Sequence, residues 1–315
     1  MPKEFTHWIL AERAMAGLAA DSRIGEILRS NHEIYLAGAV LPDTLLHLFR
    51  GPDSSACLAL ARSFHDAGDN SYAPLIRVEQ EFPDGTPAWL MACLLGVIAH
   101  MQADITFHPF VFGTAGSNDM GSHYRLETAI DVHLLRNGAI LPTRHLRDLV
   151  TPWIKEELIT AGSLLFDPQG ALHPAAMEKA LELHCRFQGR YDQIFWKLLA
   201  RMVGMLPGSH LISIQHLFYP LDMSHDNPMT TEPEPWIHPV TGERQTATID
   251  ELADQAVLQT IKIFEDIELH GSLAAALTSK PGENLLSGVH GVRRQDMKYF
   301  SNSSTECVRQ QEKTS

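Results

Sequence analysis

The sequence contains few cysteines, few strand-like patterns and no apolar run long enough to span a bilayer. Its four cysteines are widely scattered and form no CxxC pair, which excludes zinc-finger and thioredoxin-like assignments. The longest apolar stretch, Ala88 to Ala99, is shorter than the roughly 20 residues of a transmembrane helix. The first residues carry no apolar segment of the secretory type. We therefore expect a cytoplasmic protein with reduced thiols, no secretory signal and no transmembrane segment.

Positive charge is also scarce. Lys and Arg number 25 against 38 Asp and Glu, which gives a formal net charge of −13. Non-specific nucleic-acid binding needs clustered cations, so this balance disfavours a nucleic-acid partner. Histidine, in contrast, is abundant, with 17 copies against 6 Tyr. Because imidazole is the commonest metal ligand among side chains, the histidines are the first candidates for function.

Apolar residues recur at helical spacing along nearly the whole chain, which predicts an all-α fold. The segment 174–205 forms either one long helix or two that break near Gly189. We expect one helical domain over residues 1–278, with a long proline-containing loop at 219–245, and a polar C-terminal tail over 279–315 whose order the sequence leaves open. Capping residues, prolines and glycines place the expected helices at residues 5–18, 21–28, 31–40, 54–65, 86–104, 119–137, 174–205 and 248–269.

Two of these helices carry a histidine and a carboxylate four residues apart. His100 pairs with Asp104 and His123 pairs with Glu127, so each pair leaves one helical face and can chelate one ion. His108 lies between them and precedes a proline, which predicts an extended conformation that lets it bend back toward the site. One such pair alone is more often a surface ion pair or a satisfied core group. Together they predict a site for zinc, or less selectively for manganese or iron.

Three upstream residues extend this set: His7 in the first helix, Asp43 after a proline turn and His65 at a helix C-terminus. In this order the residues resemble the zinc-dependent phospholipase C family, whose fold and ligand set the single-strand-specific zinc nucleases share. The likeness is strong over about residues 1–135 and thinner beyond. It rests on Gly38-Ala39-Val40-Leu41-Pro42-Asp43, His100-Met101-Gln102-Ala103-Asp104, Phe107-His108-Pro109 and, later, Trp236-x-x-Pro239-x-x-Gly242-Glu243.

The resemblance implies an all-helical domain with a cluster of two or three zinc ions. Its first zinc would be held by four side chains, its second by His7 with a shared Asp104, and Asp43 would also be the general base. In the secreted relatives a processed N-terminal Trp completes the second site, and here Trp8 follows His7 and cannot take that place. By the same resemblance the ligands of the first zinc are Asp43, His65, His100 and Asp104, and those of the third are His108, His123 and Glu127.

The expected function is a metal-dependent phosphodiester hydrolase of the phospholipase C type. Its substrate would be a phospholipid, at a membrane surface, or a related phosphodiester. The alternatives are a nuclease or nucleotidase on the same metal site, or a non-catalytic metal-binding helical protein. The oligomeric state is left open by the sequence.

Several further residues have a structural interpretation that competes with a functional one. Asp131, four residues after Glu127, is expected to be a surface group, with the orienting of a ligand histidine as the alternative. His184 is expected to be structural or exposed. Trp236, Phe218 and Tyr219 form either an apolar lip for a substrate or part of the core.

Overall fold

The computed structural model describes residues 3–116, 119–205, 212–223, 235–278 and 280–300. Over these residues the chain is helical apart from one two-stranded ribbon, which confirms the predicted all-α fold. The elements are α1 (Glu4–Ala16), α2 (Arg23–Ser30), α3 (His32–Gly38), η1 (Leu41–His47), α4 (Ser54–His65), α5 (Ala73–Gln80), α6 (Ala88–Ala115), α7 (Met120–Arg136), α8 (Leu146–Leu149), α9 (Pro152–Phe166), α10 (Ala175–Tyr191), α11 (Ile194–Gly204), α12 (Ile212–Gln215), β1 (Trp236–Ile237), β2 (Arg244–Gln245), α14 (Ile249–His270), α15 (Leu273–Leu277) and η2 (Arg294–Asp296).

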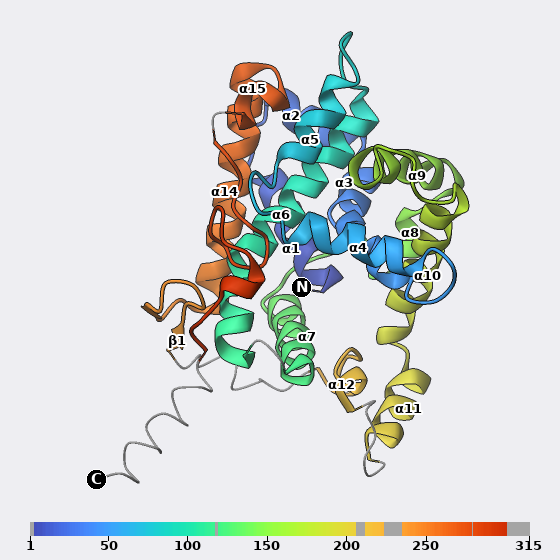
Figure 1. Cartoon of the computed structure of the whole chain (residues 1–315), viewed down its shortest axis with the longest axis vertical. Coiled ribbons are helices and arrows are strands. Elements are labelled where there is room, and N and C mark those ends of the chain that lie inside the picture. Colours follow the sequence, from blue (N-terminus) through green and yellow to red (C-terminus); the bar gives the residue numbers. More distant parts are fainter. Residues whose placement is uncertain (1–2, 117–118, 206–211, 224–234, 279, 301–315) are drawn as a thin grey trace.

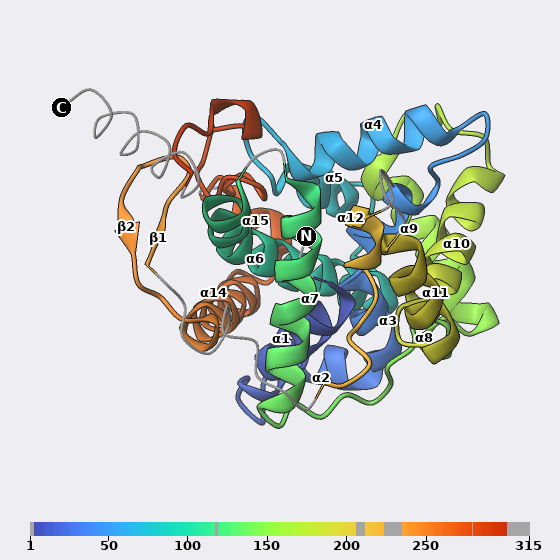
Figure 2. The ribbon, with the colours of Figure 1, turned by 90° about the horizontal axis from the view of Figure 1, so that it is seen from below.

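Helix α6 runs through the middle of the molecule, with α1, α3 and α14 packed along it (Figures 1 and 2). It is buried along nearly its whole length and is mostly apolar, because other helices surround it. By length and composition α6 could cross a membrane, but 83% of its most apolar window is buried inside the protein, as in a core helix. This central helix carries three of the predicted ligands, so the core of the fold also sets the position of the site.

Close packing of α3 against α6 depends on two glycines. A Cβ atom on Gly96 would lie 2.1 Å from the backbone oxygen of Tyr35, and one on Gly38 would lie 2.5 Å from that of Cys93. Only residues without a Cβ allow the two backbones to approach this closely. The contact brings the carbonyl of Ala39, which follows α3, against α6.

Helix α6 is longer than predicted. It continues past Asp104 and through Pro109 to Ala115, so His108 is helical and the predicted extended conformation is wrong. A proline removes one hydrogen bond from a helix but does not have to end it when other packing holds the turn. Here Gly288, at φ +68°, packs against both Pro109 and the carbonyl of Ile105, the group that lost its donor.

The other predicted boundaries lie close to the observed ones, with one difference. Residues 174–205 form two helices, α10 and α11, and the break falls at Asp192 and Gln193 rather than at Gly189. The capping box that opens α14 is present, with Thr248 and Glu251 each accepting from the other's backbone N–H. Residues 224–234 of the predicted loop lie outside the described residues.

The segment after residue 279 packs on the helices as far as residue 300. Leu285 and Asn284 are fully buried, and the Asn284 amide donates to Asp66 and to the Ala67 carbonyl. The β1–β2 ribbon lies beside this segment and α14 (Figure 2). Trp236 of β1 is in edge contact with Phe110 of α6.

Candidate metal centre

Side chains from five elements converge beside α6. His7 comes from α1, Asp43 from η1 and His65 from α4, while the remaining residues lie on α6 and α7. All eight predicted ligands are buried and stand in one connected group. The members on the two long helices are His100, Asp104 and His108 on α6, and His123 and Glu127 on α7.

Two carboxylates and two imidazoles form the centre of the group. His65 Nε2 lies 3.3 Å from Asp43 Oδ1 and 3.7 Å from Asp104 Oδ2. His100 Nε2 lies 3.3 Å from Asp104 Oδ2 and 3.9 Å from Asp43 Oδ1. Both Nε2 atoms, Asp43 Oδ1 and both Asp104 oxygens are buried without a hydrogen-bond partner. Buried polar atoms are otherwise nearly always hydrogen-bonded, so this set of facing oxygen and nitrogen atoms fits the ligands of a bound cation.

The ring orientation of three histidines supports this fit. The Nδ1 atoms of His65, His100 and His108 lie 2.8, 2.9 and 2.6 Å from the carbonyl oxygens of Ala61, Ala39 and Leu285. A carbonyl can only accept, so each Nδ1 carries the proton and each Nε2 presents its lone pair. Metal-binding histidines are commonly fixed in this way by a second hydrogen bond.

The charges of the centre also favour a cation. Burial by itself would raise the pKa values of Asp43 and Asp104, but His100 and, for Asp104, His108 keep both below the ordinary value, so both carboxylates are ionised. Burial lowers the pKa of His7 to about 3, with His100 beside it at 4.0 Å between ring centroids. Burial would lower the pKa of His100, but Asp104 and Asp43 raise it above the ordinary value, so the two carboxylates stabilise positive charge at this point. A divalent ion would take the place of the His100 proton there.

A second subset lies toward α7. One donor atom from each of His108, His123 and Glu127 lies within 4.8 Å of the others, and His123 Nε2 stands 2.7 Å from Glu127 Oε1. Burial lowers the pKa of His108 to about 3, which keeps its ring neutral and able to ligate. His7, Asp43 and His100 form a further subset within the same distance, as do His65, His100 and Asp104.

Comparison with known families agrees with this geometry. The family model for zinc-dependent phospholipase C matches residues 6–164, a segment that contains all eight predicted ligands. The chain belongs to the zinc-dependent phospholipase C family. No curated protein and no solved structure matches it. Membership of this phospholipase C family indicates a zinc-dependent phospholipase C-like function. The eight predicted ligands fit the zinc that the family name implies.

Asp131, for which the sequence favoured a surface position, supports the site from its flank. Asp131 is fully buried, so the expectation of a surface group is wrong. It accepts from the backbone N–H and the hydroxyl of Thr6, at 2.8 and 2.6 Å, and from the Tyr219 hydroxyl at 2.5 Å. Asp131 thus holds the first turn of α1, and with it His7. Its position four residues after Glu127, on the ligand face of α7, was the available signal.

The C-terminal segment also reaches this group of side chains. The backbone N–H of Arg294 donates to Asp66, the residue after His65. The Arg294 guanidinium lies 5.2 Å from the ring of Phe112, and that ring lies 4.9 Å from His123. Nothing in the spacing around Arg294 predicts this contact, because it depends on a fold-back over many residues. Trp236 and Tyr219 are buried, so both belong to the core rather than to an exposed lip.

Proposed function

We propose that this chain is a zinc-dependent phosphodiester hydrolase of the phospholipase C type, acting on a phospholipid or a related phosphodiester. The observation that carries the proposal is the buried centre of Asp43, His65, His100 and Asp104, where both histidine Nε2 atoms, Asp43 Oδ1 and both Asp104 oxygens have no hydrogen-bond partner. His65, His100, Asp43 and Asp104 would hold one ion, His7 with Asp104 a second, and His108, His123 and Glu127 a third. Zinc ions there would bind phosphoryl oxygens and lower the pKa of water toward about 7.

Asp43 is the proposed general base. Its carboxylate is ionised, and the exposed fraction of its side chain is 10%, against 0% for His100 and Asp104. It therefore stands where a buried ion and an incoming water can both be reached. His65, at 5%, and His123, at 6%, are the other two candidate ligands whose side chains are exposed to this extent, and the substrate is proposed to enter past these side chains.

Arg294 supplies the proposed positive charge at this edge. Its side chain is exposed, and it lies over Phe112 next to His123. A guanidinium there can pair with a non-bridging phosphate oxygen and orient the substrate before water attacks. The net charge of −13 is then no obstacle, because a local cation and the ions would attract the phosphodiester.

Helix α11 supports a membrane-surface substrate. None of its residues is buried, and Ile194, Phe195, Leu198 and Met202 are exposed by 46% or more. Apolar faces of this kind with a flanking cation are typical of helices that lie in a bilayer interface, and the exposed Arg201 lies on the same helix. α11 packs on α12, and α12 packs on α7, so α11 is joined through α12 to the helix that carries His123 and Glu127.

The membrane-surface proposal is tested with the double variant Phe195→Ser, Met202→Ser. We expect turnover on phosphatidylcholine vesicles to fall at least tenfold while turnover on a soluble short-chain phosphodiester stays within twofold. Equal losses on both substrates, or no loss on vesicles, would contradict a role for α11 at the membrane.

The hydrolase proposal is tested by metal content and turnover together. Zinc per chain is measured by mass spectrometry, and turnover on phosphatidylcholine, single-stranded DNA and bis(p-nitrophenyl) phosphate. We expect His100→Ala and Asp104→Ala to lose both zinc and turnover, and the control His173→Ala, outside the candidate clusters, to keep both. Turnover by a zinc-free His100→Ala variant would refute the proposal. Preference for DNA would favour a nuclease, and bound zinc without turnover a non-catalytic protein.

A cytoplasmic location is part of the proposal. Cys57, Cys93 and Cys185 are free thiols in the described part of the chain, as expected in a reducing compartment. Fractionation of cells that express the chain from its own gene would test this assignment.

A further inference from the structure

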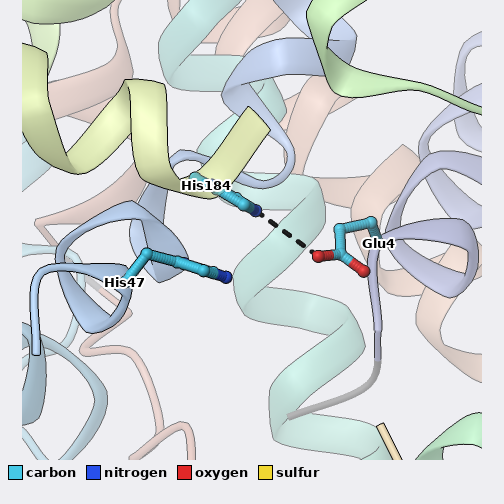
Figure 3. Close-up of side chains that lie close together, drawn as sticks. All are labelled: Glu4, His47 and His184. Atoms are coloured by element: carbon cyan, nitrogen blue, oxygen red, sulfur yellow. Dashed lines mark ion pairs between the residues drawn. The ribbon is translucent and has the colours of Figure 1, made fainter. Parts of the chain in front are cut away.

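A second cluster, with two of its three side chains buried and the third partly buried, lies outside the eight ligands. Glu4 of α1, His47 of η1 and His184 of α10 point toward one another (Figure 3). Glu4 precedes His7 by one helical turn, and His47 follows Asp43 by four residues, so two of the elements that carry the main group also carry this one. Glu4 and His184 lie outside residues 6–164, the segment that matches the family model. The cluster is thus not contained in the family match.

The spacing of the three side chains is that of a ligand set. One donor atom from each lies within 4.8 Å of the others. His184 Nε2 is 3.5 Å from Glu4 Oε1, longer than an ordinary hydrogen bond. The rings of His47 and His184 are nearly parallel, with centroids 4.1 Å apart and an interplanar angle of 13°. The pair His7 and His100 in the main group has the same arrangement, at 4.0 Å and 13°.

The outer nitrogen of each ring is already engaged. His47 Nδ1 lies 3.1 Å from the Asp43 carbonyl oxygen, which can only accept. His184 Nδ1 lies 3.1 Å from the Thr44 hydroxyl. Nδ1 is therefore the protonated nitrogen of His47, and it can be that of His184, which leaves the two Nε2 atoms to face Glu4. This is the device that fixes His65, His100 and His108 in the main group.

Two atoms of the cluster are buried and unpartnered. His184 Nε2 and Glu4 Oε2 have no hydrogen-bond partner, although His184 is 0% and Glu4 6% exposed. Lys3, the neighbour of Glu4 in the chain, is directed elsewhere, since its ammonium donates to the Leu217 carbonyl and lies over the rings of Tyr191 and Tyr219. An ion among the three side chains would satisfy the unpartnered atoms.

We propose that Glu4, His47 and His184 form a further zinc site. Two imidazoles and one carboxylate are a three-residue zinc set, with water as the fourth ligand. The site joins α10 to α1 and η1, which carry His7 and Asp43, so its ion would clamp the supports of the main group. The proposal does not rest on hydrolase activity, and its test reads metal content and position.

The decisive measurement is crystallography of the unmodified full chain, loaded with zinc and then dialysed against metal-free buffer. Data at the zinc absorption edge should show an anomalous peak at about 2.0–2.2 Å from Glu4 oxygen and from Nε2 of both histidines. A map with peaks at the main group and none here would overturn the proposal. This measurement does not depend on whether any variant folds.

Zinc stoichiometry provides the independent check. Glu4→Gln and His184→Gln should each hold one zinc fewer per chain than the unmodified protein. The control His173→Gln should hold the same number, and His100→Ala should lose zinc from the main group while the Co²⁺-substituted protein keeps the visible absorption of this site. Circular dichroism confirms that each variant is folded. Unchanged zinc in folded Glu4→Gln and His184→Gln would contradict the proposal.

Discussion

The close contact between α3 and α6 links core packing to metal binding, and Gly96→Ala tests that link. The new Cβ atom would lie 2.1 Å from the Tyr35 carbonyl oxygen, whereas real Cβ atoms essentially never come within 3.0 Å, so the backbones must separate by about 3.0 − 2.1 = 0.9 Å. Overpacking of this kind costs about 1–3 kcal/mol. We expect the unfolding midpoint to fall by several degrees, at about 2–4 °C per kcal/mol for a chain of this size or somewhat smaller.

The same displacement reaches the site through Ala39. Its carbonyl accepts from His100 Nδ1 at 2.9 Å, and a shift of 0.9 Å along that direction gives about 3.8 Å, too long for a hydrogen bond. Loss of such a support typically lowers metal affinity by about 10–100-fold. Competition with a chelator measures the affinity, and calorimetry the stability.

The matched control is Gly189→Ala, at a helical glycine where a Cβ atom would meet nothing within 4 Å. Because alanine restricts the unfolded chain more than glycine, this variant should gain about 0.4–1 kcal/mol and bind zinc normally. If Gly96→Ala is as stable as the unmodified protein and binds zinc as tightly, the proposed link between packing and site is refuted.

Three further predictions concern titration, substrate binding and metal removal. Burial raises the pKa of Asp131 from 3.8 to about 6. Between those pH values the folded state therefore binds more protons than the unfolded state, so the stability that this group contributes is lost as the pH rises from about 4 through 6. Urea unfolding should therefore show that, between pH 4 and pH 7, the free energy of unfolding of Asp131→Asn rises relative to that of the unmodified protein by up to about 3 kcal/mol. A difference between the two free energies that stays constant with pH would exclude this titration. Arg294→Gln should raise KM for an anionic phosphodiester at least fivefold with a smaller change in kcat, while the exposed control Lys298→Gln leaves both unchanged; an unaltered KM would remove Arg294 from substrate binding. Chelation with EDTA should lower the unfolding midpoint and added zinc should restore it, because zinc binds only the folded ligand set; identical midpoints would show that no zinc is bound.

Local sequence patterns predicted much of the fold and identified the candidate ligands. Helical spacing placed His100 with Asp104 and His123 with Glu127, and capping residues fixed several helix ends. The rule that proline ends a helix failed at His108, because a glycine from near the far end of the chain, Gly288, packs against Pro109 and the Ile105 carbonyl. The role of the candidate residues as metal ligands stays a prediction.

Other parts of the site depend on tertiary contacts that no local pattern contains. Asp131 lies on the same face of α7 as Glu127, but its contact with Thr6 joins residues that are 125 apart in the sequence. Glu4, His47 and His184 come from three elements and share no motif. Such groupings arise from the packing of distant helices, so a single sequence predicts their members only as isolated polar residues.

The carbonyl that orients His108 belongs to Leu285, far beyond the residues that match the family. A fragment trimmed to residues 6–164 would keep every expected ligand of the main group yet lose the acceptor that sets one imidazole's tautomer. Boundaries drawn from family likeness therefore do not mark the smallest functional unit of this chain, and expression clones need to extend past Leu285.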